Sequence, residues 1–155
     1  MAGKTKETKR PKPGACREEE VYLLLLRTTE LLWAGVSETL KEADLTPTQY
    51  NVLRILRGAG RDGASCREIG ERMVTKDSDI TRLLDRLEAR GLIARVRHAG
   101  DRRVIVARIT DEGLRLLSDL DHPVASRHRR QLGHLGDRQL GALRRLLDAV
   151  HKRPG

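Results

Sequence analysis

The chain has 155 residues, with 31 lysines and arginines against 22 aspartates and glutamates, and its isoelectric point is about 10.2. This length fits one domain, and 24 leucines beside only three aromatic side chains predict a helical, aliphatic core. So few aromatic residues exclude a base-stacking module for single-stranded nucleic acid, which leaves duplex DNA as the simplest partner for the charge. No apolar run approaches the roughly 18 residues of a membrane helix, and two cysteines without a CxxC pattern are typical of a cytoplasmic protein.

The first part of the chain divides into a tail and a long helix. Residues 1–17 are basic and nearly without apolar side chains, so we expect a flexible tail. Residues 18–42 carry apolar side chains at helical spacing on more than one side. Such a helix needs partners on both sides.

A second helix has a clear start and a clear end. Thr46, Pro47 and Gln49 form the pattern of a capping box with proline at the first helical position. The glycine-rich segment 58–63 that follows matches GxGxxG, but a dinucleotide site would need a strand before it. We therefore expect these glycines to end the helix and turn the chain.

The next helices have the pattern of a helix-turn-helix. Ser65 and Glu68 predict another capping box, and residues 74–91 place Ile80, Leu83, Leu84 and Leu87 on one helical face. Asp77 or Asp79 is expected to cap this helix, and Gly91 to end it.

A hairpin and two helices complete the chain. Residues 92–97 and 104–109 read as strands joined by a basic tip. Thr110 is expected to cap a helix that runs to about Leu135 with a bend near Pro123, and Asp137 to cap the last one.

The predicted order of short helix, longer helix and basic hairpin is that of a winged helix-turn-helix, in which a helix enters the major groove and a hairpin reaches the minor groove. Residues 61–110 hold 12 basic and 8 acidic residues, a net +4, whereas residues 21–60 are neutral with 4 of each. The basic excess therefore lies where DNA would lie.

Three stretches give the sequence a specific resemblance to the MarR family of bacterial transcriptional regulators. They are residues 45–50 (LTPTQY), residues 80–93 (ITRLLDRLEARGLI), and Asp101-Arg102-Arg103 ahead of residues 109–113 (ITDEG). The last stretch is similar to the D-x-R wing motif and the L-T-x-x-G element of the family, with Ile109 in place of leucine. The resemblance covers about residues 20–150.

The resemblance implies a mainly α fold with a small hairpin wing, in which residues 45–110 form the winged helix-turn-helix and residues 18–44 and 111–150 form dimerisation helices. It also implies a homodimeric repressor on a pseudo-palindromic operator, released by a small-molecule effector. The DNA-binding residues expected by position are Lys76, Ser78, Thr81, Arg82, Arg86, Arg95, Arg97, His98, Asp101, Arg102 and Arg103.

Several of these residues have a second interpretation. Arg95 and Arg97 form either a phosphate-binding edge or a solvated strand face. Arg103 is expected to enter the minor groove, held by Asp101, although such a pair could also be a surface ion pair only.

Two further groups of residues are candidates for dimerisation and for effector binding. Eight side chains exceed what one small winged head can cover: Leu24, Leu25, Leu31, Leu32, Leu143, Leu146, Leu147 and Val150. In the MarR family effectors often sit between the dimerisation helices and the winged head, and Trp33, Tyr50 and Arg54 are the aromatic and cationic groups near that junction. The resemblance therefore implies a pocket for a small aromatic or carboxylate effector, unless these residues serve the core.

Other functions have less support in the sequence. His122, His128 and His134 recur every six residues, so on a helix they point about 120° apart, and we predict no metal site and no cofactor. Enzymatic motifs are missing. Thiol-based redox sensing through Cys16 or Cys66, and non-specific architectural DNA binding, remain as alternative functions.

Overall fold

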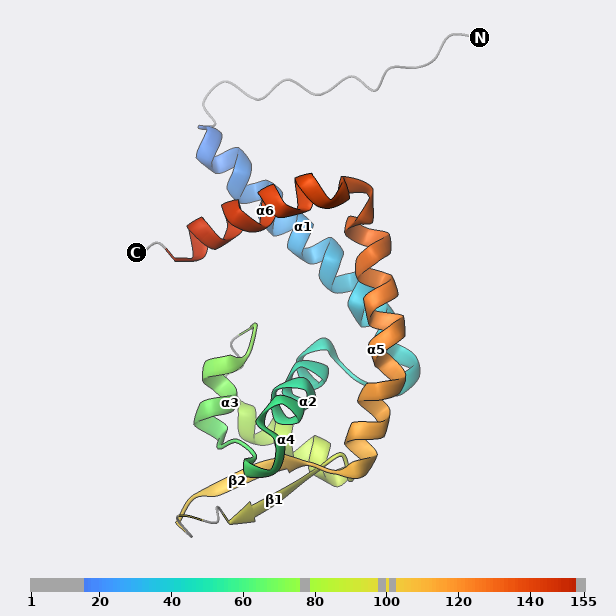
Figure 1. Cartoon of the computed structure of the whole chain (residues 1–155). Helices are drawn as coiled ribbons and strands as arrows, with labels where there is room; N and C mark the ends of the chain where they lie inside the picture. The colour runs from blue at the N-terminus through green and yellow to red at the C-terminus, as the bar shows by residue number, and fades with distance from the viewer. Residues whose placement is uncertain (1–15, 76–78, 98–99, 101–102, 153–155) are drawn as a thin grey trace.

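Two long helices form a stalk that carries a smaller head. In this computed structural model, which describes residues 16–75, 79–97, 100 and 103–152, α1 (Arg17–Leu40) packs against α5 (Asp111–Leu132) (Figure 1). The Gln131 amide donates to the carbonyl oxygens of Leu31 and Leu32 at 3.3 and 3.2 Å. A Cβ at Gly35 would lie 2.2 Å from that amide nitrogen, so this glycine permits the close contact.

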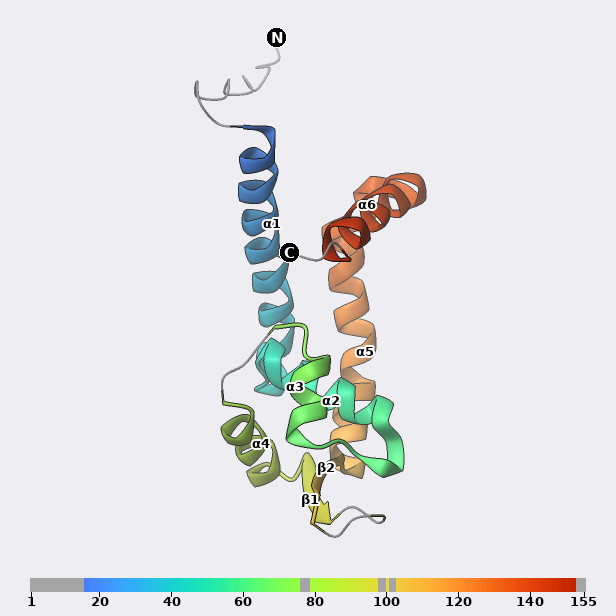
Figure 2. The ribbon, with the colours of Figure 1, turned by 90° about the vertical axis from the view of Figure 1, so that its left-hand side faces the viewer.

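The head consists of α2 (Pro47–Ala59), α3 (Cys66–Arg72), α4 (Ile80–Ala89) and a hairpin, and it lies in the lower half of Figure 2 beside the lower part of α5. Its helices begin where the sequence predicts, because each start is fixed by a local cap. Both capping boxes form, Thr46 with Gln49 and Ser65 with Glu68, and Asp79 caps α4. Thr110 likewise caps α5, as predicted.

The glycine-rich segment after α2 turns the chain, as expected. Gly60 and Gly63 have φ angles of 61° and 72°, in the region that favours glycine. A Cβ at Gly63 would lie 2.5 Å from the carbonyl oxygen of Ala107, so only glycine lets the chain pass this close to the hairpin. Ala64 then exchanges two backbone hydrogen bonds with Ala107, at 3.0 and 2.8 Å.

The predicted hairpin is present. Its strands, β1 (Ile93–Arg97) and β2 (Ile105–Ile109), are antiparallel, with Ile93 opposite Ile109 and Arg97 opposite Ile105.

The core lies inside the head and against the first half of α5. Its largest fully buried side chains are Leu40, Val52, Leu53, Leu56, Ile69, Leu84, Leu87, Ile93 and Leu117. Burial of each such leucine contributes about 1.5 to 3 kcal/mol, so the head is held mainly by aliphatic packing.

The last helix, α6 (Gly136–His151), starts differently from the prediction. Asp137 is not its cap: α6 begins at Gly136, and Leu135 is the N-cap residue without a side-chain cap hydrogen bond. Gly136 has a φ angle of 69° and turns the chain between the short 3-10 helix Gly133–Leu135 and α6. Asp137 lies in the first turn instead. No residue of α6 is buried in the single chain. None of the helices, within the part of the chain described, has the length and apolar character needed to span a membrane.

Candidate DNA-binding surface and junction cavity

Helix α4 presents one apolar and one polar face, as its sequence predicts. Leu83, Leu84 and Leu87 are buried in the head, whereas Thr81 and Arg82 are exposed. The Asp79 carboxylate accepts the backbone N–H of Arg82 at 3.0 Å, so the cap fixes the first turn of the helix.

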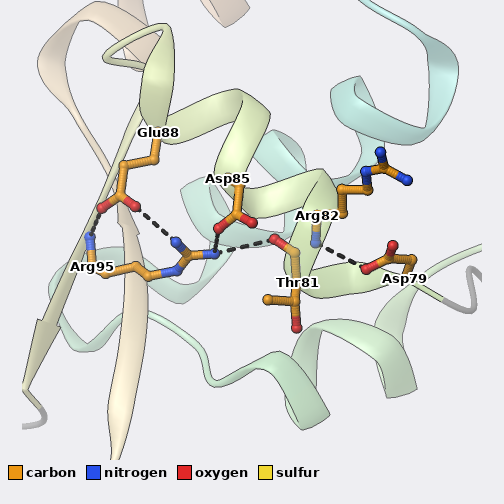
Figure 3. Close-up of polar contacts among 6 residues, drawn as sticks. All are labelled: Asp79, Thr81, Arg82, Asp85, Glu88 and Arg95. Carbon is orange, nitrogen blue, oxygen red and sulfur yellow. Dashed lines mark hydrogen bonds and ion pairs between the residues drawn. The ribbon is translucent and has the colours of Figure 1, made fainter.

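Arg95 on β1 joins the hairpin to α4 (Figure 3). Its guanidinium forms ion pairs with Asp85 at 2.7 Å and Glu88 at 2.8 Å, and it donates to the carbonyl of Thr81 at 3.2 Å. Glu88 also accepts the backbone N–H of Arg95 at 2.9 Å. Two carboxylates thus compensate this cation within the head.

The electrostatics agree with this geometry. Partial burial by itself lowers the pKa of Arg95, but the hydrogen bond and charge of Asp85, followed by the attraction of Glu88, outweigh it and leave the pKa raised. Arg95 is therefore a charged strut between α4 and the hairpin, and its side chain is only 26% exposed.

A separate basic edge of α4 is formed by Arg82 and Arg86, four residues apart and both exposed. In Figure 3 the guanidinium of Arg82 points away from Asp85, Glu88 and Arg95. Neither Arg82 nor Arg86 has an ion pair with another residue that the structure describes. This edge therefore offers two cations to an external anion.

The wing carries two further described arginines. Arg97 ends β1 and Arg103 precedes β2, and both are exposed. The other predicted DNA-binding residues, Lys76, Ser78, His98, Asp101 and Arg102, lie outside the described residues, as does Asp77.

The structure brings the three predicted effector residues, Trp33, Tyr50 and Arg54, to one cavity of about 400 Å³ between stalk and head. The guanidinium carbon of Arg54 lies 5.8 Å from the centroid of the Tyr50 ring. Burial raises the pKa of Tyr50, so its hydroxyl is protonated at neutral pH. The remaining lining residues are Thr29, Leu32, Val36, Pro47, Asn51, Val74, His128 and Leu132.

The sequence did not single out Asn51 or His128 for this cavity. The Asn51 side-chain oxygen accepts the backbone N–H of Val74 at 3.0 Å, which ties the cavity wall to the turn after α3. His128 lines the cavity from α5. In the sequence it stood out only through the six-residue spacing of three histidines, which bears on a metal site and not on this cavity. Within the described residues no group of three or more histidine, cysteine, aspartate or glutamate side chains could hold a metal ion.

Arg90 makes a third contact that the sequence did not predict, with the connection between α1 and α2. The guanidinium of Arg90 donates to the carbonyl oxygens of Ala43, at 2.9 Å, and Asp44. Asp44 has a φ angle of 49°, so Arg90 stabilises a sharp turn.

The predicted dimerisation residues lie mostly on open surface. In the single chain Leu24, Leu31, Leu146 and Val150 are 64 to 67% exposed, and Leu147 is 43% exposed. Leu25, Leu32 and Leu143 are partly buried.

A capped helix with an exposed basic edge beside an antiparallel hairpin defines a winged helix-turn-helix DNA-binding protein. The chain belongs to the MarR family: the model of that family matches residues 43–104. The HTH-type transcriptional repressor MdtR of Bacillus subtilis (strain 168) is 45% identical over 94 residues, which are 61% of this chain and 59% of MdtR. The match with MdtR spans less than two thirds of that protein. As a member of the MarR family, the chain is a DNA-binding transcriptional regulator.

Two solved structures extend the similarity to most of the chain. A MarR transcription factor from Planctomyces limnophilus is 41% identical, with a TM-score of 0.67, over 90% of this chain and 99% of that one. CouR from Rhodococcus jostii RHA1, solved with bound p-coumaroyl-CoA, is 28% identical, with a TM-score of 0.76, over 89% and 96% of the two chains. The stalk and the head therefore both have counterparts in known regulators.

Proposed function

We propose that the protein is a dimeric repressor that binds a pseudo-palindromic operator and leaves it when a small aromatic carboxylate fills the junction cavity. The observation that carries the DNA-binding part is the edge of Arg82 and Arg86 on α4. The carboxylates Asp85 and Glu88 of the same helix are engaged by Arg95, so the charge left at that edge is positive.

Readout of DNA is divided between helix and wing. Arg82, with Thr81 beside it, is proposed to contact base edges or adjacent phosphates in the major groove. Arg103 is proposed to enter the minor groove, where the potential is strongly negative. Lys76, Ser78, His98, Asp101 and Arg102 extend these two contacts by their positions in the sequence.

The exposed leucines of α1 and α6 support a homodimer. Exposed apolar side chains gathered on two helices are typical of an interface, and Leu146 and Val150 are exposed by two thirds in the single chain. A two-fold dimer would present two heads, which matches a pseudo-palindromic site.

The lining of the junction cavity supports the effector class. Trp33 and Tyr50 offer aromatic surface, and Arg54 and His128 offer hydrogen-bond donors suited to a carboxylate. CouR was solved with an aromatic acyl thioester, p-coumaroyl-CoA, which is consistent with an aromatic ligand here.

Asn51 provides the proposed route from cavity to DNA. A ligand in contact with Val74 would press on the turn between α3 and α4, which Asn51 holds through its hydrogen bond to the Val74 N–H. The effector would thereby favour a position of α4 that does not fit the operator.

The function is tested by selecting bound sequences from random duplex and then screening aromatic acids for release. We expect an inverted-repeat consensus and at least one acid that lowers operator affinity tenfold or more. Binding of all duplexes with equal affinity would instead identify an architectural protein.

The coupling is tested with two Asn51 variants and the acid found in that screen. Asn51→Gln keeps an amide oxygen that can accept the Val74 N–H and adds no charge to the cavity, whereas Asn51→Leu removes the acceptor. We expect both to bind the acid, and only Asn51→Leu to lose most of the acid's effect on operator affinity. Equal release by the two variants would contradict the route through Val74.

A further inference from the structure

A second cavity of about 400 Å³ lies at the other end of α2, where the glycine-rich segment meets β2 and the start of α5. Three arginines line it, Arg57, Arg61 and Arg108, together with Gly60, Ile109, Asp111 and Leu114. The glycine segment that resembled a nucleotide fingerprint thus forms one wall of a basic cavity, although no strand precedes it.

The aliphatic part of the Arg108 side chain packs against the chain at this cavity and holds the residue in place. A Cβ at Gly63 would lie 2.8 Å from the Arg108 Cγ, so the bare glycine backbone packs directly on the side chain. The Arg108 Nε is buried and has no hydrogen-bond partner among the described residues. A buried donor without an acceptor is unfavourable, but this atom has no surface open to the cavity. An anion in the cavity would therefore be bound by the terminal nitrogens of the Arg108 guanidinium, not by Nε.

Arg108 faces away from the strut between α4 and the wing. It pairs across the hairpin with Ala94, one residue before Arg95. Because side chains alternate along a strand, Arg95 and Arg108 emerge on opposite faces of the hairpin. The cavity is therefore separate from the basic edge of α4.

The charge of the cavity favours an anion. Arg57 is paired with Asp121, but Arg61 and Arg108 have no ion pair with any residue that the structure describes. Asp111 is the single carboxylate in the described lining. Two uncompensated guanidinium groups against one carboxylate leave the cavity positive.

We infer that this cavity binds the phosphate group of a small molecule, with Arg61 and Arg108 as its principal ligands. Guanidinium groups match phosphate oxygens in geometry and donate two parallel hydrogen bonds each. The volume accommodates a phosphate with a small body, which would rest against Ile109 and Leu114.

The test uses inorganic phosphate and pyrophosphate as probes on the full-length protein, by calorimetry and thermal shift at an ionic strength held constant with chloride. We expect saturable binding with one site per chain. Arg108→Gln and Arg61→Gln should each weaken it at least tenfold. Arg67→Gln is the matched control, because it removes the same charge from a side chain 88% exposed on α3, and it should change nothing.

Three results would overturn the proposal. The first is no saturable binding up to 10 mM of either probe. The second is equal binding by Arg61→Gln, Arg108→Gln and parent, with circular dichroism showing that the variants fold. The third is that Arg61→Gln and Arg108→Gln bind every DNA duplex more weakly than the parent in phosphate-free buffer, and that their affinity depends less steeply on salt concentration. This result would assign the cavity to the DNA backbone. None of these results bears on the effector proposed for the junction cavity.

Discussion

Arg57 on α2 and Asp121 on α5 form a two-pronged ion pair, with both guanidinium nitrogens 2.9 Å from the carboxylate oxygens. The two residues are 64 positions apart and join the head to the stalk. The Arg57 hydrogen bond lowers the pKa of Asp121, against the opposing effect of burial. The pair is therefore one of the contacts that fix the angle between head and stalk.

We expect Asp121→Asn to lower the free energy of unfolding at pH 7 by about 0.5 to 1 kcal/mol, a modest value because the Asp121 side chain is half exposed. The pKa of Asp121 is lower in the folded chain than in the unfolded chain, so the contribution is present above the unfolded value, near 4, and is lost as pH falls through the folded value. Urea titrations of parent and variant at one protein concentration, repeated at decreasing pH, should thus converge once the pH lies below the folded pKa of Asp121. A gap that persists there would show that packing, not charge, is responsible.

The strut of Arg95 leads to a second prediction. If Arg95 acts by holding the wing on α4, then Arg95→Gln and Glu88→Gln should lower operator affinity alike, by about three- to tenfold, without changing the salt slope. If Arg95 instead contacts phosphate, Arg95→Gln alone should lose affinity and reduce the slope by about one. Binding isotherms at several salt concentrations distinguish the two interpretations.

Local signals explain which parts of the structure were predictable. The capping boxes, Asp79, Thr110 and the hairpin are all specified within a few consecutive residues, and all occur as predicted. The prediction of Asp137 as the cap of α6 was wrong, because the helix begins one residue earlier, at Gly136, where a φ angle of 69° turns the chain after the 3-10 helix. A capping pattern does not reveal what conformation the preceding residues adopt.

The contacts that shape the candidate sites depend on residues far apart in sequence. Arg57 with Asp121, and Asn51 with Val74, are 64 and 23 positions apart, and no short pattern pairs them. Arg95 could be recognised as basic and strand-borne, but its two carboxylate partners follow only from how the hairpin packs on α4. Position relative to the family motifs was enough to place Trp33, Tyr50 and Arg54 near one cavity.

The homodimer is open to a direct test. We expect sedimentation equilibrium at micromolar concentration to give twice the chain mass, and Leu146→Asp with Leu147→Asp to give a monomer that no longer binds the operator. Gln139→Asp, which adds one negative charge at an exposed polar position of the same helix, should leave the dimer intact. A parent protein of single-chain mass would contradict the proposal.

Trp33, the single tryptophan, reports on the junction cavity. We expect its fluorescence to change on titration with benzoate, 4-hydroxybenzoate or cinnamate. Arg54→Gln should weaken carboxylate binding by at least tenfold, because a charge-assisted hydrogen bond contributes about 1.5 to 3 kcal/mol. The matched amides should bind parent and variant equally. Insensitivity of both fluorescence and melting temperature to a broad panel of such acids would remove the support for this effector class.

The last prediction separates base reading from groove clamping. Arg103→Ala should weaken binding to operator and random duplex alike and reduce the salt slope by about one phosphate equivalent per head, because minor-groove potential attracts the guanidinium without identifying a base. Arg82→Ala should cost about 1 to 3 kcal/mol per half-site on the operator alone and narrow the gap to random DNA, because a base-edge contact is lost. Asp101→Ala should resemble a mild Arg103 variant, since it would remove orientation but not charge. Isotherms on operator and scrambled duplex across salt concentrations measure all three. Unchanged affinity of Arg103→Ala for both duplexes would mean that the hairpin formed by residues 93–109 is not a DNA-binding wing.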